Sequence, residues 1–174
     1  MKKLLLNTES VKEAMAQIVA EKLKFYQGTL QLEVSEDKIY REVEAAAIES
    51  MDTIMSNYSH KALTWFGKII RLIFTTIYDK IIVNEEHLEA VRRLCSNRKG
   101  PVVFCPTHRS YVDFLLVSSV LFFYKMEVPF ICAGEDLMHI KGVSHILRMS
   151  GAFFMRRTFR GDPLYKAIFT EYVQ

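Results

Sequence analysis

Cysteine is scarce in this sequence, and the spacing of the few present excludes the usual cysteine-based classes. Cys95, Cys105 and Cys132 are odd in number and include no CxxC pair, so a closed disulfide framework or a typical zinc site is not expected. Two of the three lie in apolar runs, which predicts buried, reduced thiols. The histidines also lack metal-type spacing such as HxxxH, because His139 and His145 are six apart. No metal is therefore expected.

Long hydrophobic runs are missing as well. The first residues, MKKLLLN, contain an apolar run of only three, which fits no secretory signal peptide. Between Ala62 and Val83 apolar residues cover nearly the whole circumference of a helix, but Lys68 and Arg71 interrupt them. A membrane-spanning helix needs roughly 20 continuous apolar residues. This stretch instead favours a buried helix or one that lies in the plane of a membrane, and its contact with lipid stays open.

Negative charge is absent from one part of the chain. No Asp or Glu occurs between Leu137 and Gly161, where Lys and Arg supply five positive charges of a chain whose formal net charge is only +3. The formal charges of all other residues therefore sum to −2. The total is too small to indicate a nucleic-acid partner, but the local field suits an anionic ligand or an anionic membrane surface.

Apolar periodicity predicts helices in the first half of the chain. Half of all residues are hydrophobic and a quarter are charged, which is typical of a folded chain of about one domain. Apolar residues recur every three or four positions. They predict helices at residues 8–26, at 35–55 with Ser35 as N-cap, and at 62–83. A helix at 85–94 is predicted from Asn84 as cap and from acids at its start and bases at its end.

Strands and helices alternate in the second half. Strands are predicted at 102–105, 128–132 and 152–155, helices at 110–124 and 135–149, and a last helix from Asp162-Pro163. This order predicts parallel βαβ units, so the fold class is α/β, with an N-terminal helical region (1–58) before a βαβ-type domain (59–174). Three strands are few for this architecture, and the last helix is still periodic at Gln174. The domain is therefore expected to be incomplete.

Two residues after the first predicted strand could carry acid–base chemistry. His108 and Asp113 are five apart, a spacing that points two side chains away from each other on one helix. They can meet if His108 lies in the loop and Asp113 in the first helical turn. A carboxylate on one imidazole nitrogen would orient the ring while the other nitrogen removes a proton from a hydroxyl. The alternative is structural, because Ser110 to Asp113 also matches a capping box.

A second cluster follows the last predicted strand. Arg156, Arg157 and Arg160 stand between Met155 and Gly161. Arginine binds phosphate through paired donors of fixed geometry, so these side chains are candidates for a phosphate site. A solvated basic loop explains the same residues. Together, a base for a hydroxyl and a site for a phosphate suggest chemistry on a phosphorylated alcohol.

The two clusters resemble motif blocks of the glycerolipid acyltransferases. His108 to Asp113 (HRSYVD) resembles the HX4D block, and Gly151 to Arg157 (GAFFMRR) resembles the second block. Within this family of glycerol-3-phosphate and dihydroxyacetone phosphate acyltransferases, the chain is most similar to the dihydroxyacetone phosphate branch. The resemblance covers residues 57–174 well and the N-terminal helices weakly.

The resemblance implies an incomplete α/β acyltransferase domain with no cofactor and acyl-CoA as bound donor substrate. It implies that His108 deprotonates a hydroxyl of dihydroxyacetone phosphate and that Asp113 orients His108. It places phosphate binding on Arg156 and Arg157, to which Arg160 is added for its charge. Arg109 and Ser110 are candidates to assist. The implied role is ether-lipid and phospholipid synthesis at the peroxisomal membrane, with mitochondrial or endoplasmic reticulum membrane as alternatives.

The family's third and fourth blocks are expected beyond Gln174, so half of the acceptor site would be missing and the isolated chain could be inactive. Three alternatives stay open. One is a glycerol-3-phosphate 1-O-acyltransferase, and another is a truncated, non-catalytic module that associates with membranes. The third, a thiol hydrolase using Cys105 with His108 as base, has poor geometry because the residues are three apart across a strand end.

Overall fold

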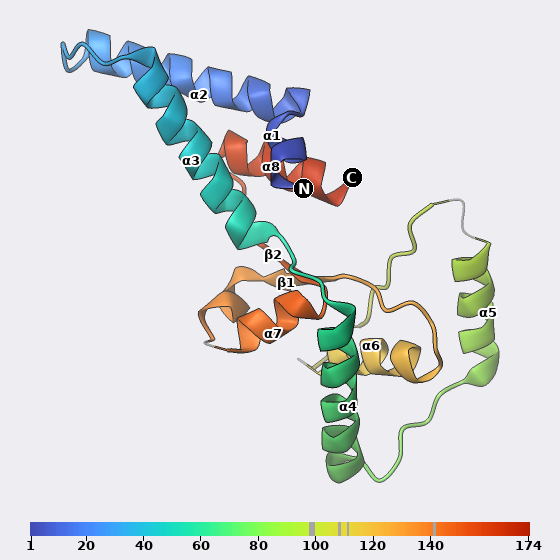
Figure 1. Cartoon of the computed structure of the whole chain (residues 1–174). Coiled ribbons are helices and arrows are strands. Elements are labelled where there is room, and N and C mark those ends of the chain that lie inside the picture. Colours follow the sequence, from blue (N-terminus) through green and yellow to red (C-terminus); the bar gives the residue numbers. More distant parts are fainter. Residues whose placement is uncertain (98–99, 108, 111, 141) are drawn as a thin grey trace. The chain divides into compact units, whose positions relative to one another are not determined.

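The computed structural model describes residues 1–97, 100–107, 109–110, 112–140 and 142–174. The chain divides into two compact units, which are described separately (Figure 1). The first unit contains Met1–Ser56, Cys132–Ser144 and Phe153–Gln174, and the second contains Asn57–Ile131 and His145–Ala152. The expected boundary between residues 58 and 59 stays a prediction.

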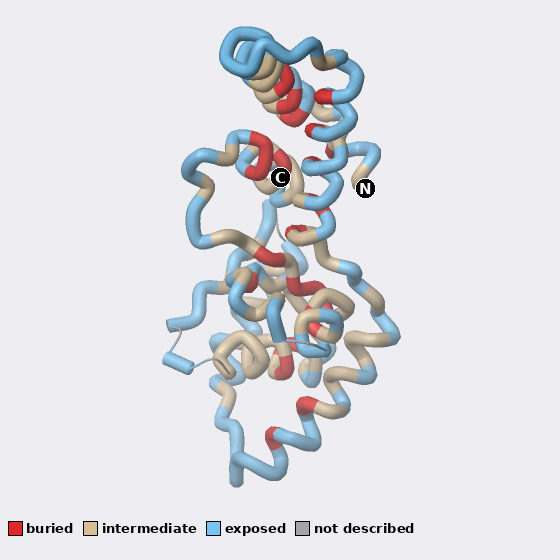
Figure 2. The backbone as a smooth tube through the Cα atoms, turned by 90° about the vertical axis from the view of Figure 1, so that its left-hand side faces the viewer, coloured by how far each residue is buried: buried red, intermediate tan, exposed pale blue. Residues whose placement is uncertain are grey.

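Helices build the core of the first unit. They are α1 (Lys2–Leu6), α2 (Glu9–Gly28), α3 (Glu36–Ile54) and α8 (Pro163–Val173). α2 packs against α3, and both contact α8. Each helix buries one stripe and exposes the rest (Figure 2), and each large apolar side chain buried there contributes roughly 1.5–3 kcal/mol. The stripes comprise Val11, Met15 and Val19 of α2, five residues of α3 from Ile39 to Ile54, and Leu164, Tyr165 and Ile168 of α8. The helices predicted at 8–26 and 35–55 are confirmed to within two residues.

A parallel pair of strands follows the order predicted from the sequence. β1 (Ile131–Gly134) and β2 (Ala152–Met155) are neighbours in one sheet. The 3-10 helix η1 (Glu135–His139) and α7 (Val143–Met149) connect them, as a crossover between parallel strands requires. The α/β class with preceding helices is therefore confirmed.

Three helices form most of the second unit: α4 (His60–Ile77), α5 (Glu85–Ser96) and α6 (Asp113–Phe123). α4 packs against α6. Asn84 caps α5 as predicted, because its side-chain oxygen accepts the His87 N–H at 3.0 Å. The Arg92 guanidinium donates to the carbonyl of Tyr124 at 3.1 Å, which ties α5 to the end of α6.

The prediction of a strand at 102–105 is wrong. Residues 101–107 have no regular secondary structure, and Val103 is 78% exposed. A strand needs a neighbouring ladder of hydrogen bonds, and in the described part of the chain β1 and β2 pair only with each other. The prediction of buried thiols is also wrong, since Cys105 lies in this exposed segment and Cys132 is exposed as well.

Three predicted helices differ in extent. The helix expected to reach Val83 ends at Ile77. The β-branched residues that follow at 81–83 favour extended backbone over helix. The helix expected at 135–149 is divided, because Ile140 adopts an extended conformation after η1. The helix expected from Ser110 begins at Asp113. Among the described residues, no helix combines the length and the hydropathy needed to cross a bilayer.

Candidate active site

The candidate residues of the first block lie at the start of α6, in the second unit. His108 and Tyr111 are outside the described residues. Arg109 and Ser110 are exposed. Asp113 is the first residue of α6, so it occupies the first turn, as the predicted arrangement requires.

Asp113 and Ser110 contact each other through a closed set of hydrogen bonds. Asp113 Oδ2 accepts the backbone N–H of Ser110 at 3.0 Å, and Ser110 Oγ accepts the N–H of Val112 at 3.2 Å. The backbone N–H of Asp113 donates to the carbonyl of Ser110 at 3.2 Å. The bond from the Ser110 N–H to Asp113 corresponds to the return half of a capping box, but the N-cap of α6 is Val112 and no side chain caps the helix there.

The bond from Ser110 engages one oxygen of the Asp113 carboxylate. Oδ1 has no hydrogen-bond partner among the described residues, and the side chain is half-buried. A carboxylate has two acceptor oxygens, so this bond and the orientation of an imidazole are compatible roles. The Ser110 backbone N–H holds the carboxylate through Oδ2.

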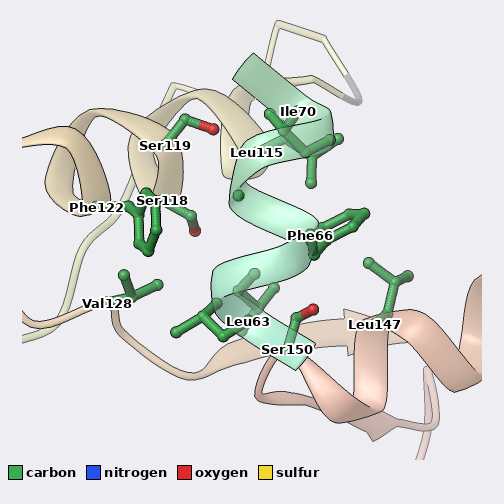
Figure 3. Close-up of a pocket in the computed structure, with 12 residues that line it drawn as sticks. Leu63, Phe66, Ile70, Leu115, Ser118, Ser119, Phe122, Val128, Leu147 and Ser150 are labelled. Carbon is green, nitrogen blue, oxygen red and sulfur yellow. The ribbon is translucent and has the colours of Figure 1, made fainter. Parts of the chain in front are cut away.

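α4 packs against α6, the helix that carries Asp113. A small apolar cavity of about 30 Å³ lies beside the contact between the two helices, and Figure 3 shows Leu63, Phe66 and Ile70 of α4 next to it, with Leu115 and Phe122 of α6. A cavity of this size holds little more than one water-sized group. The site therefore rests on a packed helix pair.

The arginines of the second block lie in the first unit, between β2 and α8. Phe153 of β2 packs against Tyr172 of α8 at 5.7 Å between ring centroids, and Phe159 of the intervening segment packs against Phe169 of α8 at 5.2 Å. Such pairs contribute beyond their buried area. The segment from Arg156 to Asp162 is therefore anchored at both ends.

Arg156 is held by three contacts. Its guanidinium bonds Asp162 Oδ2 at 2.7 Å and lies 4.2 Å from the centroid of the Tyr165 ring. Its backbone N–H donates to the Tyr165 hydroxyl at 3.0 Å. A cation over an aromatic face and a carboxylate partner both restrict the guanidinium. These contacts hold the Arg156 side chain in one orientation, although 38% of it is exposed.

Arg157 and Arg160 are more exposed. Arg157 pairs with Asp136 of η1 at 2.5 Å. Arg160 has no carboxylate partner among the described residues, and its backbone N–H donates to Thr158 Oγ1 at 3.2 Å. The positive field expected from residues 137–161 is thus weakened by two acids that flank the window.

Desolvation raises the pKa of two ionisable groups in this unit, the hydroxyl of the buried Tyr165 and the thiol of Cys132. Burial raises the pKa of the Tyr165 hydroxyl, opposed by the hydrogen bond from Arg156 and by its charge. Burial also raises the pKa of the Cys132 thiol, which lowers the fraction of nucleophilic thiolate at neutral pH. Among the described residues, no group of three His, Cys, Asp or Glu side chains could hold a metal ion.

Sequence reasoning missed the partners of the arginines. Asp136, Asp162 and Tyr165 hold Arg156 and Arg157 in place. One signal was present, because Asp162-Pro163 marks a helix start, and Asp162 does cap α8 by accepting the N–H of Tyr165 at 2.9 Å. Nothing in the linear sequence indicates that the same carboxylate also binds Arg156.

Comparison with known proteins places both blocks in one family. The family profile described as Acyltransferase matches residues 80–174. The dihydroxyacetone phosphate acyltransferase of Mus musculus is 45% identical over 130 residues, covering 72% of this chain and 19% of that protein. The glycerol-3-phosphate acyltransferase of Pseudomonas entomophila (strain L48) is 38% identical over 142 residues, covering 81% of this chain and 16% of that protein. The chain spans about a fifth or less of the length of these curated relatives. The chain belongs to the acyltransferase family.

Proposed function

We propose that this chain carries the first two motif blocks of an O-acyltransferase that transfers an acyl group from acyl-CoA to a hydroxyl of dihydroxyacetone phosphate. The observation that carries the proposal is its similarity to proteins of that name. Identity is 44–46% to four dihydroxyacetone phosphate acyltransferases and 38–39% to four glycerol-3-phosphate acyltransferases. Glycerol-3-phosphate 1-O-acyl transfer is therefore the second candidate.

His108 is proposed as the general base. Its imidazole removes the proton of the acceptor hydroxyl, and the oxygen attacks the thioester carbonyl of acyl-CoA. The tetrahedral intermediate collapses with cleavage of the carbon–sulfur bond, and the imidazolium returns its proton to the departing CoA thiolate. Asp113 orients the imidazole and stabilises its cation, a role supported by its position at the start of α6 and by its Oδ1, which has no hydrogen-bond partner among the described residues.

Arg156, Arg157 and Arg160 are proposed to bind the acceptor phosphate. Arg160 has no carboxylate partner among the described residues, so it can take a phosphate without breaking an ion pair. Arg156 offers the N–H groups of its guanidinium that Asp162 does not engage, in an orientation fixed by Tyr165. Arg157 exchanges Asp136 for phosphate at little cost, because exposed ion pairs are worth about 0–1 kcal/mol.

No cofactor is proposed beyond the acyl-CoA donor. Arg109 and Ser110 are proposed to assist near the base, although the Ser110 oxygen already accepts the Val112 N–H. The resemblance to the dihydroxyacetone phosphate branch supports a role in ether-lipid synthesis at the peroxisomal membrane. Mitochondrial and endoplasmic reticulum membranes are the alternatives that accompany a glycerol-3-phosphate acceptor.

The proposal is tested by acyl transfer from radiolabelled palmitoyl-CoA in detergent micelles. Dihydroxyacetone phosphate and glycerol 3-phosphate are offered separately. The chain is assayed alone and also in place of the matching segment of the mouse enzyme, because it spans only 19% of that protein. His108→Ala is compared with His87→Ala, an exposed histidine on α5.

Activity lost in His108→Ala and kept in His87→Ala supports the enzyme, and the preferred acceptor identifies its substrate. A raised acceptor KM with little change in kcat in Arg160→Gln supports phosphate binding. Full activity of His108→Ala would overturn the assignment of the base. Absence of transfer in both settings would favour the non-catalytic, membrane-associated module.

A further inference from the structure

Two carboxylates contact the arginine cluster formed by Arg156, Arg157 and Arg160. The guanidinium of Arg156 donates to Asp162 Oδ2 at 2.7 Å, and that of Arg157 donates to Asp136 Oδ2 at 2.5 Å. Each carboxylate offsets one positive charge of the surface that is proposed to bind the acceptor phosphate. The two acids are alike in charge and in contact distance, and they differ in what else holds them.

Asp162 is held from both sides. Its Oδ1 accepts the N–H of Tyr165 at 2.9 Å as the N-cap of α8. The guanidinium that it contacts lies 4.2 Å from the centroid of the Tyr165 ring, and the Arg156 N–H donates to the Tyr165 hydroxyl at 3.0 Å. A guanidinium has five N–H donors, so a phosphate can bind those that Asp162 does not use. Asp162 therefore presents Arg156 to a ligand and need not leave when the ligand binds.

Asp136 is held at the arginine alone. It belongs to the short helix η1, and its carboxylate makes no other hydrogen bond among the described residues. The Arg157 side chain is 78% exposed and that of Asp136 is 63% exposed, so water can solvate both groups as soon as they separate. Exposed ion pairs of this kind shift an equilibrium by at most about fivefold. A ligand with more charge than one carboxylate can therefore replace Asp136.

We propose that Asp136 is an intramolecular competitor for the acceptor phosphate and that Asp162 is a positioning residue, so that the two acids change acceptor affinity in opposite directions. The inference rests on the proposed function, in which the arginine cluster binds this phosphate. A phosphate monoester carries a charge of about −1.5 to −2 at neutral pH and three acceptor oxygens, so it displaces the single carboxylate from Arg157. Acceptor binding then releases η1 from the arginine cluster.

Asp136→Asn and Asp162→Asn form a charge-matched pair, because each removes one negative charge beside the cluster. Binding of glycerol 3-phosphate and of dihydroxyacetone phosphate is followed through the side-chain Nε–H NMR signals of the three arginines. Acceptor KM and kcat are measured in the mouse enzyme that carries this segment. Asp136→Asn should lower Kd and KM by about two- to fivefold and leave kcat unchanged.

Asp162→Asn should have the opposite effect. Asparagine caps a helix as well as aspartate does, so α8 stays capped while Arg156 loses its ionic partner. The ligand must then order the arginine side chain, which should weaken binding by about two- to tenfold. Circular dichroism checks that both variants are folded, and Asp136→Ala should tighten binding as Asp136→Asn does.

Equal tightening in Asp136→Asn and Asp162→Asn would mean that net charge alone sets the affinity, and it would overturn the inference. Unchanged affinity in Asp136→Asn while Arg160→Gln weakens binding would also overturn it, because phosphate would then bind the cluster without displacing Asp136. The phosphate site itself would be overturned, and this inference with it, if no arginine signal responded to either acceptor and Arg160→Gln left KM unchanged.

Discussion

Asp162 and Arg156 are joined through one oxygen of a carboxylate whose other oxygen caps a helix. Oδ2 accepts the guanidinium at 2.7 Å, and Oδ1 accepts the N–H of Tyr165 at the start of α8 at 2.9 Å. The helix cap therefore fixes the position of the arginine. A change at Asp162 alters helix stability and arginine placement together.

Asp162→Ala should lower the free energy of unfolding by about 1–2 kcal/mol. Loss of the cap costs about 1 kcal/mol, and the half-exposed ion pair adds less than that. Asp162→Asn keeps an oxygen for the cap and should lose clearly less. Urea denaturation followed by circular dichroism measures both values. Equal losses in the two variants would mean that the cap contributes nothing.

Gly67→Ala should destabilise the packing of α4 on α6. A Cβ at this position would lie 2.8 Å from Cε1 of Phe122, so the ring must move, at a cost of about 1–3 kcal/mol. The same change at Gly28, where no atom lies within 4 Å, should instead stabilise by about 0.5–1 kcal/mol. Thermal denaturation of both variants gives the comparison, and Phe122→Leu should relieve part of the loss at Gly67. A stable Gly67→Ala variant would show that the close approach is absent in solution.

Tyr165→Phe should change how stability depends on alkaline pH. Burial raises the pKa of Tyr165 above its ordinary value of about 10. The unfolded chain therefore ionises first, and the stabilisation is present below pH ~10 and is lost as pH rises through the folded-state pKa. The difference in free energy of unfolding between wild type and Tyr165→Phe, measured from pH 7 to 11.5, should shrink or reverse at the alkaline end. A constant difference would contradict the raised pKa.

Gly151→Ala should strain the turn between α7 and β2. Gly151 has φ +99°, a region that costs a residue with a side chain about 1–2 kcal/mol, and Phe130 lies 3.4 Å from the position of a new Cβ. Gly134, with φ −68°, is the control. Chemical denaturation should show a loss for Gly151→Ala and little change for Gly134→Ala. Similar results for both would remove the conformational argument at position 151.

Local signals predicted the parts of the fold that local interactions determine. α2, α3 and α5 follow from apolar periodicity, and β2 was placed at its observed residues. The strand predicted at 102–105 failed because an apolar run does not specify a pairing partner. The end of α4 was misplaced because apolar content continues past Ile77 while helix preference does not.

For the candidate site, the sequence predicted the place of Asp113 in the fold but not the contacts of the arginines. The position of Asp113 in the first turn of α6 follows from the spacing to the preceding loop. The pairing of Arg156 and Arg157 did not follow, because Asp162 and Asp136 lie just outside the acid-free window. Charge counted along a sequence does not reveal which acids fold back onto it. The roles of His108 and Asp113 stay predictions.

The packing of α8 against α2 and α3 also affects how the protein is made. These helices are separated by more than 100 residues of chain, so their contacts close a very long loop. During synthesis, the apolar stripes of α2 and α3 emerge from the ribosome well before α8 exists to cover them. At about 5–20 residues per second, that interval lasts several seconds. The surfaces of α2 and α3 that contact α8 therefore stay uncovered by it until residues 163–173 are made.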